Sequence, residues 1–197
     1  LPPIGSRGFA EGYNEARIRK ELRAYLALCS QVDHAIGTIL QGLKSSGQDR
    51  DTVIVYSSDH GDYAGEHGAM EKVGGISYRA VTQVPLILNV PGIKNAGKVS
   101  DAIIESVDLF PTLCQLINIP IPNTVQGKSF IEILTGKVDS IRTSALTENP
   151  YRKSLATKEW RYVANIDSQK DELYNIVDDP WELNNRIDDT EYKDTAG

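Results

Sequence analysis

The sequence predicts an α/β fold, and three features of its first 120 residues lead to that prediction. Apolar residues recur every three or four positions between Asn14 and Ser46, the pattern of one long amphipathic helix. Two short apolar runs follow at 52–56 and 86–90, and their lack of polar alternation is typical of strands covered on both faces, as in a parallel sheet. Another helix is predicted from Ser106. Helix, strand, loop, strand and helix in this order indicate an α/β domain.

The long helix carries start and stop signals. Asn14 is a suitable N-cap, and Gly47 is a suitable C-terminal stop.

The two cysteines, Cys29 and Cys114, are too few and too far apart for a disulfide framework or a metal knuckle. Each sits among apolar neighbours, so both are predicted to be buried free thiols. The apolar stripe of the helix consists of Ile18, Leu22, Tyr25, Cys29, Val32, Ile36, Ile39 and Leu43.

The chain changes character after residue 120. We expect residues 1–120 to form the C-terminal half of a mixed, mostly parallel sheet flanked by helices, with Asp108 capping the second helix. Residues 121–197 are expected to form a small subdomain of antiparallel strands and a helix. Its strand candidates are residues 145–147, 154–157, 160–164 and 172–176. Two or three buried strands cannot close a parallel sheet, so we expect another piece of polypeptide to complete it.

Composition excludes some functions. The formal net charge of −6 argues against nucleic acid as a partner, because phosphates select for basic surfaces. An anion site on this chain must therefore be positive locally. No apolar run approaches the roughly 20 residues that a membrane-spanning helix needs.

The segment that carries chemistry is the loop after the first predicted strand. Asp59 and His60 stand side by side where that strand ends, which is the edge at which open α/β sheets bind ligands. A carboxylate beside an imidazole suits a metal ion, and Lys72 adds a positive charge suited to an oxyanion. The alternative is a solvent-exposed turn in which Asp59 caps the backbone and His60 has no role.

Several motifs in this loop and beyond it resemble the second half of the sulfatase family, within the alkaline phosphatase superfamily. The resemblance covers the chain from about residue 20 to residue 186, and several motifs in the right order are more specific than any single one. The motifs are Ser58–Asp62, Gly65–Gly68, Lys72, Val84–Ile87, Pro91–Gly92, Val107–Leu113, Glu172–Asn175 and Asp179–Asn185.

The resemblance implies roles for four residues. Asp59 and His60 would be two ligands of a divalent cation, usually calcium, and Lys72 would contact the sulfate. His67 would either reach the substrate or orient the loop by hydrogen bonds. A histidine ligand in place of an amide is similar to the iduronate-2-sulfatase, choline-sulfatase and phosphonate monoester hydrolase branches, and it leaves manganese or zinc as alternatives.

The family's nucleophile is not found in these residues. Sulfatases use a formylglycine made from Cys or Ser in a Cys/Ser-x-Pro/Ala-x-Arg sequence, and neither Cys29 nor Cys114 begins one. We therefore expect the chain to be the C-terminal portion of a sulfatase, to bind metal weakly and to be inactive alone. Self-association through an exposed sheet edge is a further expectation. A periplasmic or secreted location is implied by family analogy only, so the compartment is open.

Three functions compete at this stage. The first is hydrolysis of sulfate esters by the intact protein. The second is hydrolysis of phosphonate monoesters or phosphodiesters, because the same ligand pair and lysine serve phosphoryl transfer. The third is a non-catalytic module that uses the fold for binding or assembly.

Overall fold

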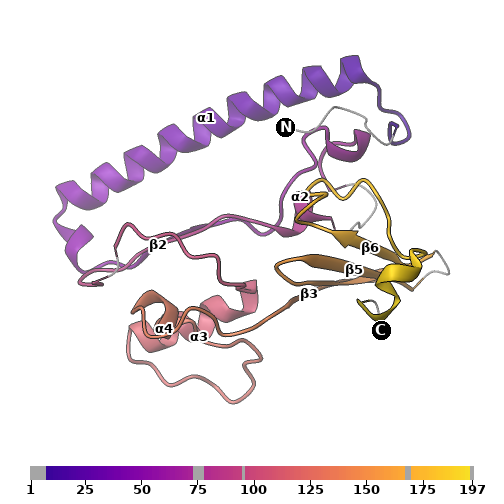
Figure 1. Ribbon diagram of the computed structural model, residues 1–197. Coiled ribbons are helices and arrows are strands. Elements are labelled where there is room, and N and C mark those ends of the chain that lie inside the picture. The colour runs from indigo at the N-terminus through magenta and orange to yellow at the C-terminus, as the bar shows by residue number, and fades with distance from the viewer. Residues whose placement is uncertain (1–7, 73–77, 95, 167–169, 196–197) are drawn as a thin grey trace.

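The computed structural model describes residues 8–72, 78–94, 96–166 and 170–195, and Figure 1 shows how their elements are arranged. The α-helices are α1 Glu15–Ser45, α2 Arg79–Thr82, α3 Leu109–Leu116 and α4 Ile131–Leu134. The strands are β1 Ile54–Ser57, β2 Leu86–Asn89, β3 Ala145–Asn149, β4 Arg152–Ala156, β5 Trp160–Asn165 and β6 Glu172–Asn175. Short 3₁₀ turns lie at Gln48–Arg50, Glu66–Gly68, Ser106–Asp108 and Thr190–Thr195. No helix in the described ranges has both the length and the apolar character needed to cross a membrane.

Helix α1 begins and ends at the predicted residues. The Asn14 side chain accepts a hydrogen bond from the Arg17 N–H at 2.9 Å, and Gly47 adopts the left-handed conformation, with φ of 73°. The apolar stripe, however, is largely open to solvent, because of all the residues in α1 only Ile18 is buried. The prediction that Cys29 is buried is therefore wrong, whereas Cys114 is buried as predicted.

Strands β1 and β2 form a two-stranded antiparallel ribbon in which Ile54 pairs with Asn89 and Ser57 with Leu86. Figure 1 shows α1 running along one side of this ribbon, with α3 and α4 on the other. The α/β class is confirmed, but the pairing that this chain supplies is antiparallel. The parallel neighbours expected for the larger sheet do not occur among the described residues. Accordingly Tyr56 and Ile87 remain exposed instead of covered.

The predicted antiparallel strands of the C-terminal part are confirmed. They form one four-stranded sheet in the order β3-β4-β5-β6, with each strand paired to the next along the chain. Its buried face meets the loop that follows β1, and the two share one apolar cluster. That cluster consists of Tyr63, Ala69, Tyr78 and Tyr174. The sheet therefore supports the loop expected to carry chemistry.

Asp108 is fully buried but does not cap α3 with its side chain. Its carboxylate instead accepts hydrogen bonds from the N–H groups of Glu105 and Lys128, at 2.9 and 2.7 Å, and pairs with Arg142. The bond from Glu105 is part of a capping box in the 3₁₀ turn that precedes α3, so Asp108 does cap locally, and it also binds partners up to 34 residues away. Lys128 and Arg142 bind Asp108 at the start of α3, so contacts cross residue 120. The expected domain boundary at that residue stays a prediction.

Candidate functional site

Asp59 and His60 lie directly after β1 and face the same space. The Nε2 atom of His60 is 3.7 Å from Oδ2 of Asp59, with 38% of the His60 side chain and 85% of the Asp59 side chain exposed. The other oxygen of Asp59 accepts a hydrogen bond from the His60 N–H at 3.0 Å. Ligands of one ion lie about 2.0–2.6 Å from it, so two atoms 3.7 Å apart can share a cation.

The His60 ring is held in the tautomer that a metal ligand needs. Its Nδ1 lies 2.8 Å from the carbonyl oxygen of Gly61. A carbonyl can only accept a hydrogen bond, so Nδ1 carries a proton, and in the neutral ring Nε2 then holds the lone pair that a metal ion binds. Metal-binding histidines generally donate their second ring N–H to a carbonyl or carboxylate in this way. The arrangement fits a divalent cation.

The charge state of Asp59 fits the same role. The hydrogen bond from the His60 N–H lowers the pKa of Asp59 below its ordinary value, the charge of the His60 ring lowers it further, and the Lys72 ammonium adds a smaller effect. Asp59 is therefore ionised at neutral pH. The effect of Lys72 on Asp59 also means that the two side chains lie within electrostatic reach of each other.

Two ligands do not complete a metal shell. Among the residues that the structure describes, no group of three or more His, Cys, Asp and Glu side chains could hold an ion. Calcium prefers about six to eight oxygen ligands, and structural zinc takes about four. The chain can therefore supply only part of a metal site.

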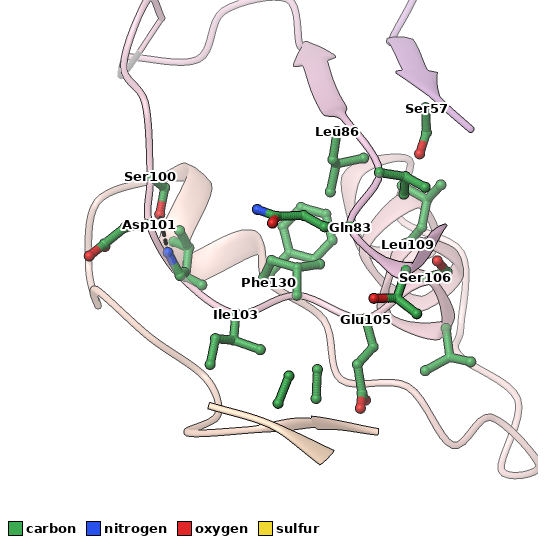
Figure 2. Close-up of a pocket in the computed structure, with 18 of the residues that line it drawn as sticks. Ser57, Gln83, Leu86, Ser100, Asp101, Ile103, Glu105, Ser106, Leu109 and Phe130 are labelled. Atoms are coloured by element: carbon green, nitrogen blue, oxygen red, sulfur yellow. Dashed lines mark hydrogen bonds between the residues drawn. The ribbon is translucent and has the colours of Figure 1, made fainter. Parts of the chain in front are cut away.

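Asp59, His60 and Lys72 line one open cavity of about 2080 Å³. Known small-molecule pockets occupy roughly 300–1000 Å³, so this trough is too large for a small ligand alone. Figure 2 shows part of it, where Leu86 and Phe130 point inward and Ser57 lies at the end of β1. Three of the four predicted site residues therefore line the same trough.

The fourth predicted residue, His67, lies elsewhere. Its ring stacks on Tyr78, with centroids 4.1 Å apart and planes inclined by 13°, and it meets Tyr63 edge-on at 5.9 Å. His67 is not among the residues that line the trough. The hydroxyl of Tyr78 in turn donates to Glu172 on β6 at 2.9 Å. These contacts favour the loop-orienting alternative for His67, which remains a prediction.

The closing signature of the sequence builds a scaffold. Glu182 is buried, forms an ion pair with Arg161 on β5 and accepts a hydrogen bond from the Arg79 N–H at 2.7 Å. Asp179 accepts hydrogen bonds from the N–H groups of Leu183 and Asn184, at 2.8 and 2.7 Å. Glu182 connects the C-terminal sheet to α2, and of the residues in this network Arg79 and Arg161 line the trough whereas Glu182 and Asp179 do not.

Gly61 allows the loop to pass close to α2. Its N–H donates to the Val81 carbonyl at 2.8 Å, and a Cβ at this position would lie 2.0 Å from the carbonyl oxygen of Ala80. Any side chain here must push the loop away from α2, and with it Asp59 and His60. The sequence contains this glycine but does not reveal that the backbone of Ala80 lies against it.

Replacing Gly61 with Ala is expected to lower the free energy of unfolding of the full-length protein by about 1–3 kcal/mol, because overpacked sites of this kind cost that much. Thermal denaturation measures the change. Gly42→Ala is the matched control, since a Cβ there meets nothing within 4 Å and Ala is favoured in a helix. Equal stability of the Gly61 variant and the wild type would contradict the close approach.

One residue of the loop was underrated by sequence reasoning. Asp62 was given no role of its own, yet its Oδ1 accepts hydrogen bonds from the N–H groups of Ala64 and Glu71, at 2.7 and 3.0 Å. The bond from the Ala64 N–H could have been predicted, because Asp side chains commonly accept a hydrogen bond from the N–H two residues ahead in a turn. The second spans nine residues and could not.

Comparisons with known proteins show the family of the chain. The family model described as Sulfatase matches residues 4–119, and the one described as N-sulphoglucosamine sulphohydrolase, C-terminal, matches residues 65–196. Human arylsulfatase K is 32% identical over 182 residues, which are 84% of this chain and 33% of that protein.

Two solved structures extend the likeness to the fold. A protein solved in complex with its substrate D-glucosamine-2-N,6-O-disulfate matches with a TM-score of 0.83 and 29% identity, over 94% of this chain and 40% of that chain. Phosphonate monoester hydrolase from Silicibacter pomeroyi matches with a TM-score of 0.78 and 28% identity, over 87% and 38% of the two chains.

The chain spans about a third to two fifths of the length of these relatives. The matches nevertheless run through almost all of its own residues, from the segment before α1 to the turn after β6. Because the sulfatase family model covers more than half of the sequence, the chain belongs to the sulfatase family.

Proposed function

We propose that this chain is part of a sulfuric ester hydrolase, in which Asp59 and His60 bind a divalent cation and Lys72 contacts the sulfate group. The observation that carries the proposal is that Asp59, His60 and Lys72 all line one trough, with the two ligand atoms of Asp59 and His60 3.7 Å apart. The pKa of Asp59, lowered mainly by His60 and partly by Lys72, supports an ionised carboxylate beside a positive charge.

Each residue has a distinct task in this proposal. Asp59 offers an exposed carboxylate oxygen, and His60 offers Nε2 because its Nδ1–H donates a hydrogen bond to the Gly61 carbonyl. Lys72 places a compact positive charge where a sulfate oxygen would bind, which offsets the negative net charge of the chain. The bound cation, calcium or alternatively manganese or zinc, would neutralise negative charge on the transferring group.

The remaining parts of the reaction lie outside these residues. The formylglycine nucleophile expected for the family requires a sequence that the 197 residues do not contain. With two metal ligands and no such nucleophile, the chain on its own is proposed to bind metal weakly and to lack turnover. Its substrate class is a sulfate ester, and the complex of a related protein with a sulfated glucosamine favours a sulfated sugar.

A second candidate is hydrolysis of phosphonate monoesters, favoured by the likeness to the Silicibacter pomeroyi enzyme. Both reactions place a tetrahedral anion beside a cation and a lysine, so the described residues suit either one. The sulfatase reading is preferred because both matching family models are sulfatase models.

A side-by-side rate measurement tests the proposal. The full-length protein is expected to hydrolyse 4-nitrophenyl sulfate with a kcat/KM at least about tenfold above that for 4-nitrophenyl phenylphosphonate, a difference of about 1.4 kcal/mol in transition-state stabilisation. The reverse order would replace the proposal with the phosphonate reaction. Hydrolysis of neither ester, nor of sulfated glucosamine, would favour a non-catalytic module.

A further inference from the structure

The loop between β1 and α2 has two arms that both reach the trough. The first arm leaves β1 and carries Asp59 and His60, and the second arm ends at Lys72. Lys72 lies twelve positions after His60 along the chain, so how close the two come depends on how the arms are joined. Lys72 is exposed and its side chain is long, so the place of its charge depends on the backbone that carries it.

Asp62 joins the two arms. Its Oδ1 accepts one hydrogen bond from the Ala64 N–H, at 2.7 Å, and a second from the Glu71 N–H, at 3.0 Å. The Glu71 carbonyl accepts a third bond, from the Tyr63 N–H at 2.9 Å. Residue 71 is therefore tied to residues 62 and 63 through both its N–H and its carbonyl. Lys72 follows immediately, so its Cα position is set by these bonds.

The first arm is anchored without Asp62. Strand β1 pairs with β2 up to Ser57, and the Gly61 N–H donates to the Val81 carbonyl at 2.8 Å. The residues enclosed by the two arms are also fixed separately, since Tyr63 is fully buried and the Gly65 N–H donates to Ala69. Loss of the Asp62 bonds would therefore release mainly the second arm.

Asp62 is badly placed to be a metal ligand itself. It does not line the trough that Asp59, His60 and Lys72 share. Its Oδ1 already accepts two backbone N–H groups, which directs that oxygen into the loop. A carboxylate used in this way acts on the position of its neighbours.

We propose that Asp62 is a positioning residue, which holds Lys72 beside Asp59 and His60 by bracing the two arms of the loop. This inference rests on the proposed function, in which Lys72 contacts the sulfate. A misplacement of about 1 Å at a reacting group can cost about a hundredfold in rate, so a brace of this kind has a measurable effect.

The geometry supplies a matched pair of variants. Both bonds go to a single oxygen, so Asp62→Asn keeps the acceptor and removes only the charge, whereas Asp62→Ala removes both. In the full-length protein, Asp62→Ala is expected to lower kcat/KM for 4-nitrophenyl sulfate by about 10- to 100-fold. Asp62→Asn is expected to stay within about threefold of the wild type, since its amide oxygen can replace the lost acceptor. If Asp62→Asn lowers kcat/KM as much as Asp62→Ala does, the charge of Asp62 is what matters, and the proposal that its hydrogen bonds brace the loop is wrong.

A double-mutant cycle separates positioning of Lys72 from general support of the fold. If Asp62 acts through Lys72, then Asp62→Ala should change kcat/KM by less than about threefold when Lys72 is already Ala. A structural role elsewhere would give the same loss in both backgrounds, and that result would overturn the proposal.

Amide hydrogen exchange tests the brace independently of catalysis. In the full-length protein, the Ala64 and Glu71 amides are expected to exchange at least about tenfold faster in Asp62→Ala and at the wild-type rate in Asp62→Asn. Unchanged exchange in the Ala variant would overturn the brace whatever the enzyme hydrolyses. If the wild type cleaves no ester but its Ala64 and Glu71 amides are protected and lose that protection in Asp62→Ala, the proposed function is wrong and the bracing role of Asp62 is still supported.

Discussion

Replacing Asp59 with Ala in the full-length protein is expected to lower kcat for sulfate-ester hydrolysis by at least about a thousandfold, which corresponds to about 4 kcal/mol. The physical reason is loss of the ionised oxygen that faces Nε2 of His60 across 3.7 Å. Without it, His60 is the one ligand left of the pair, and the cation loses both affinity and position. Initial rates with saturating 4-nitrophenyl sulfate and added calcium measure the effect.

The fold should survive that change. The Asp59 side chain is 85% exposed, and its hydrogen bond goes to the adjacent His60 N–H. The melting temperature is therefore expected to stay within about 2 °C of the wild type. Asp51→Ala, which removes another exposed carboxylate from the segment before β1, is the control and should retain full activity. Retained turnover in the Asp59 variant would remove this residue from the metal site.

Elements with local signals were predictable from the sequence. The ends of α1 depend on Asn14 and Gly47, which act on the residues beside them. The C-terminal sheet was predictable because its four strands pair with their neighbours in the chain and polar turns separate them. The pairing of Asp59 with His60 is also local, since the two residues are adjacent at the end of a strand.

Features that depend on distant partners were not predictable. The apolar composition of β1 and β2 indicates that they are strands, but it does not indicate the direction in which they pair or which faces are covered. Cys29 lies on an apolar stripe, and such a stripe does not reveal whether the described residues cover it. Asp108 has the residue type of a cap, but Lys128 and Arg142 bind it from well beyond the helix.

The same distinction divides the candidate site. Residue type and spacing predicted a carboxylate, an imidazole and an ammonium near one another, and the trough lining agrees with that grouping. The stacking of His67 on Tyr78, and the second hydrogen bond of Asp62, need a loop whose path the sequence does not specify. Sequence therefore indicated the chemistry of the loop, and the structure adds how the loop is held.

The buried ion pair between Glu182 and Arg161 gives the largest expected effect on stability. Only 1% of the Glu182 side chain and 6% of the Arg161 side chain are exposed. Removal of one partner leaves the other charge buried without compensation, which typically costs about 3–5 kcal/mol. Glu182→Ala is therefore expected to lower the free energy of unfolding by that amount. It also removes the acceptor for the Arg79 N–H, and so loosens the connection between β5 and α2.

Urea unfolding of the full-length protein, followed by tryptophan fluorescence, measures this change near its source. Trp160 precedes Arg161 and Trp181 precedes Glu182, so both indoles report on the region around the pair. The matched control is Glu148→Ala, which breaks the exposed pair with Lys153, whose side chains are 52% and 58% accessible. Exposed pairs contribute at most about 1 kcal/mol, so the two variants should differ severalfold. Similar losses in both would show that Glu182 does not hold Arg161 as a buried charge, and the closing signature of the sequence would need another role.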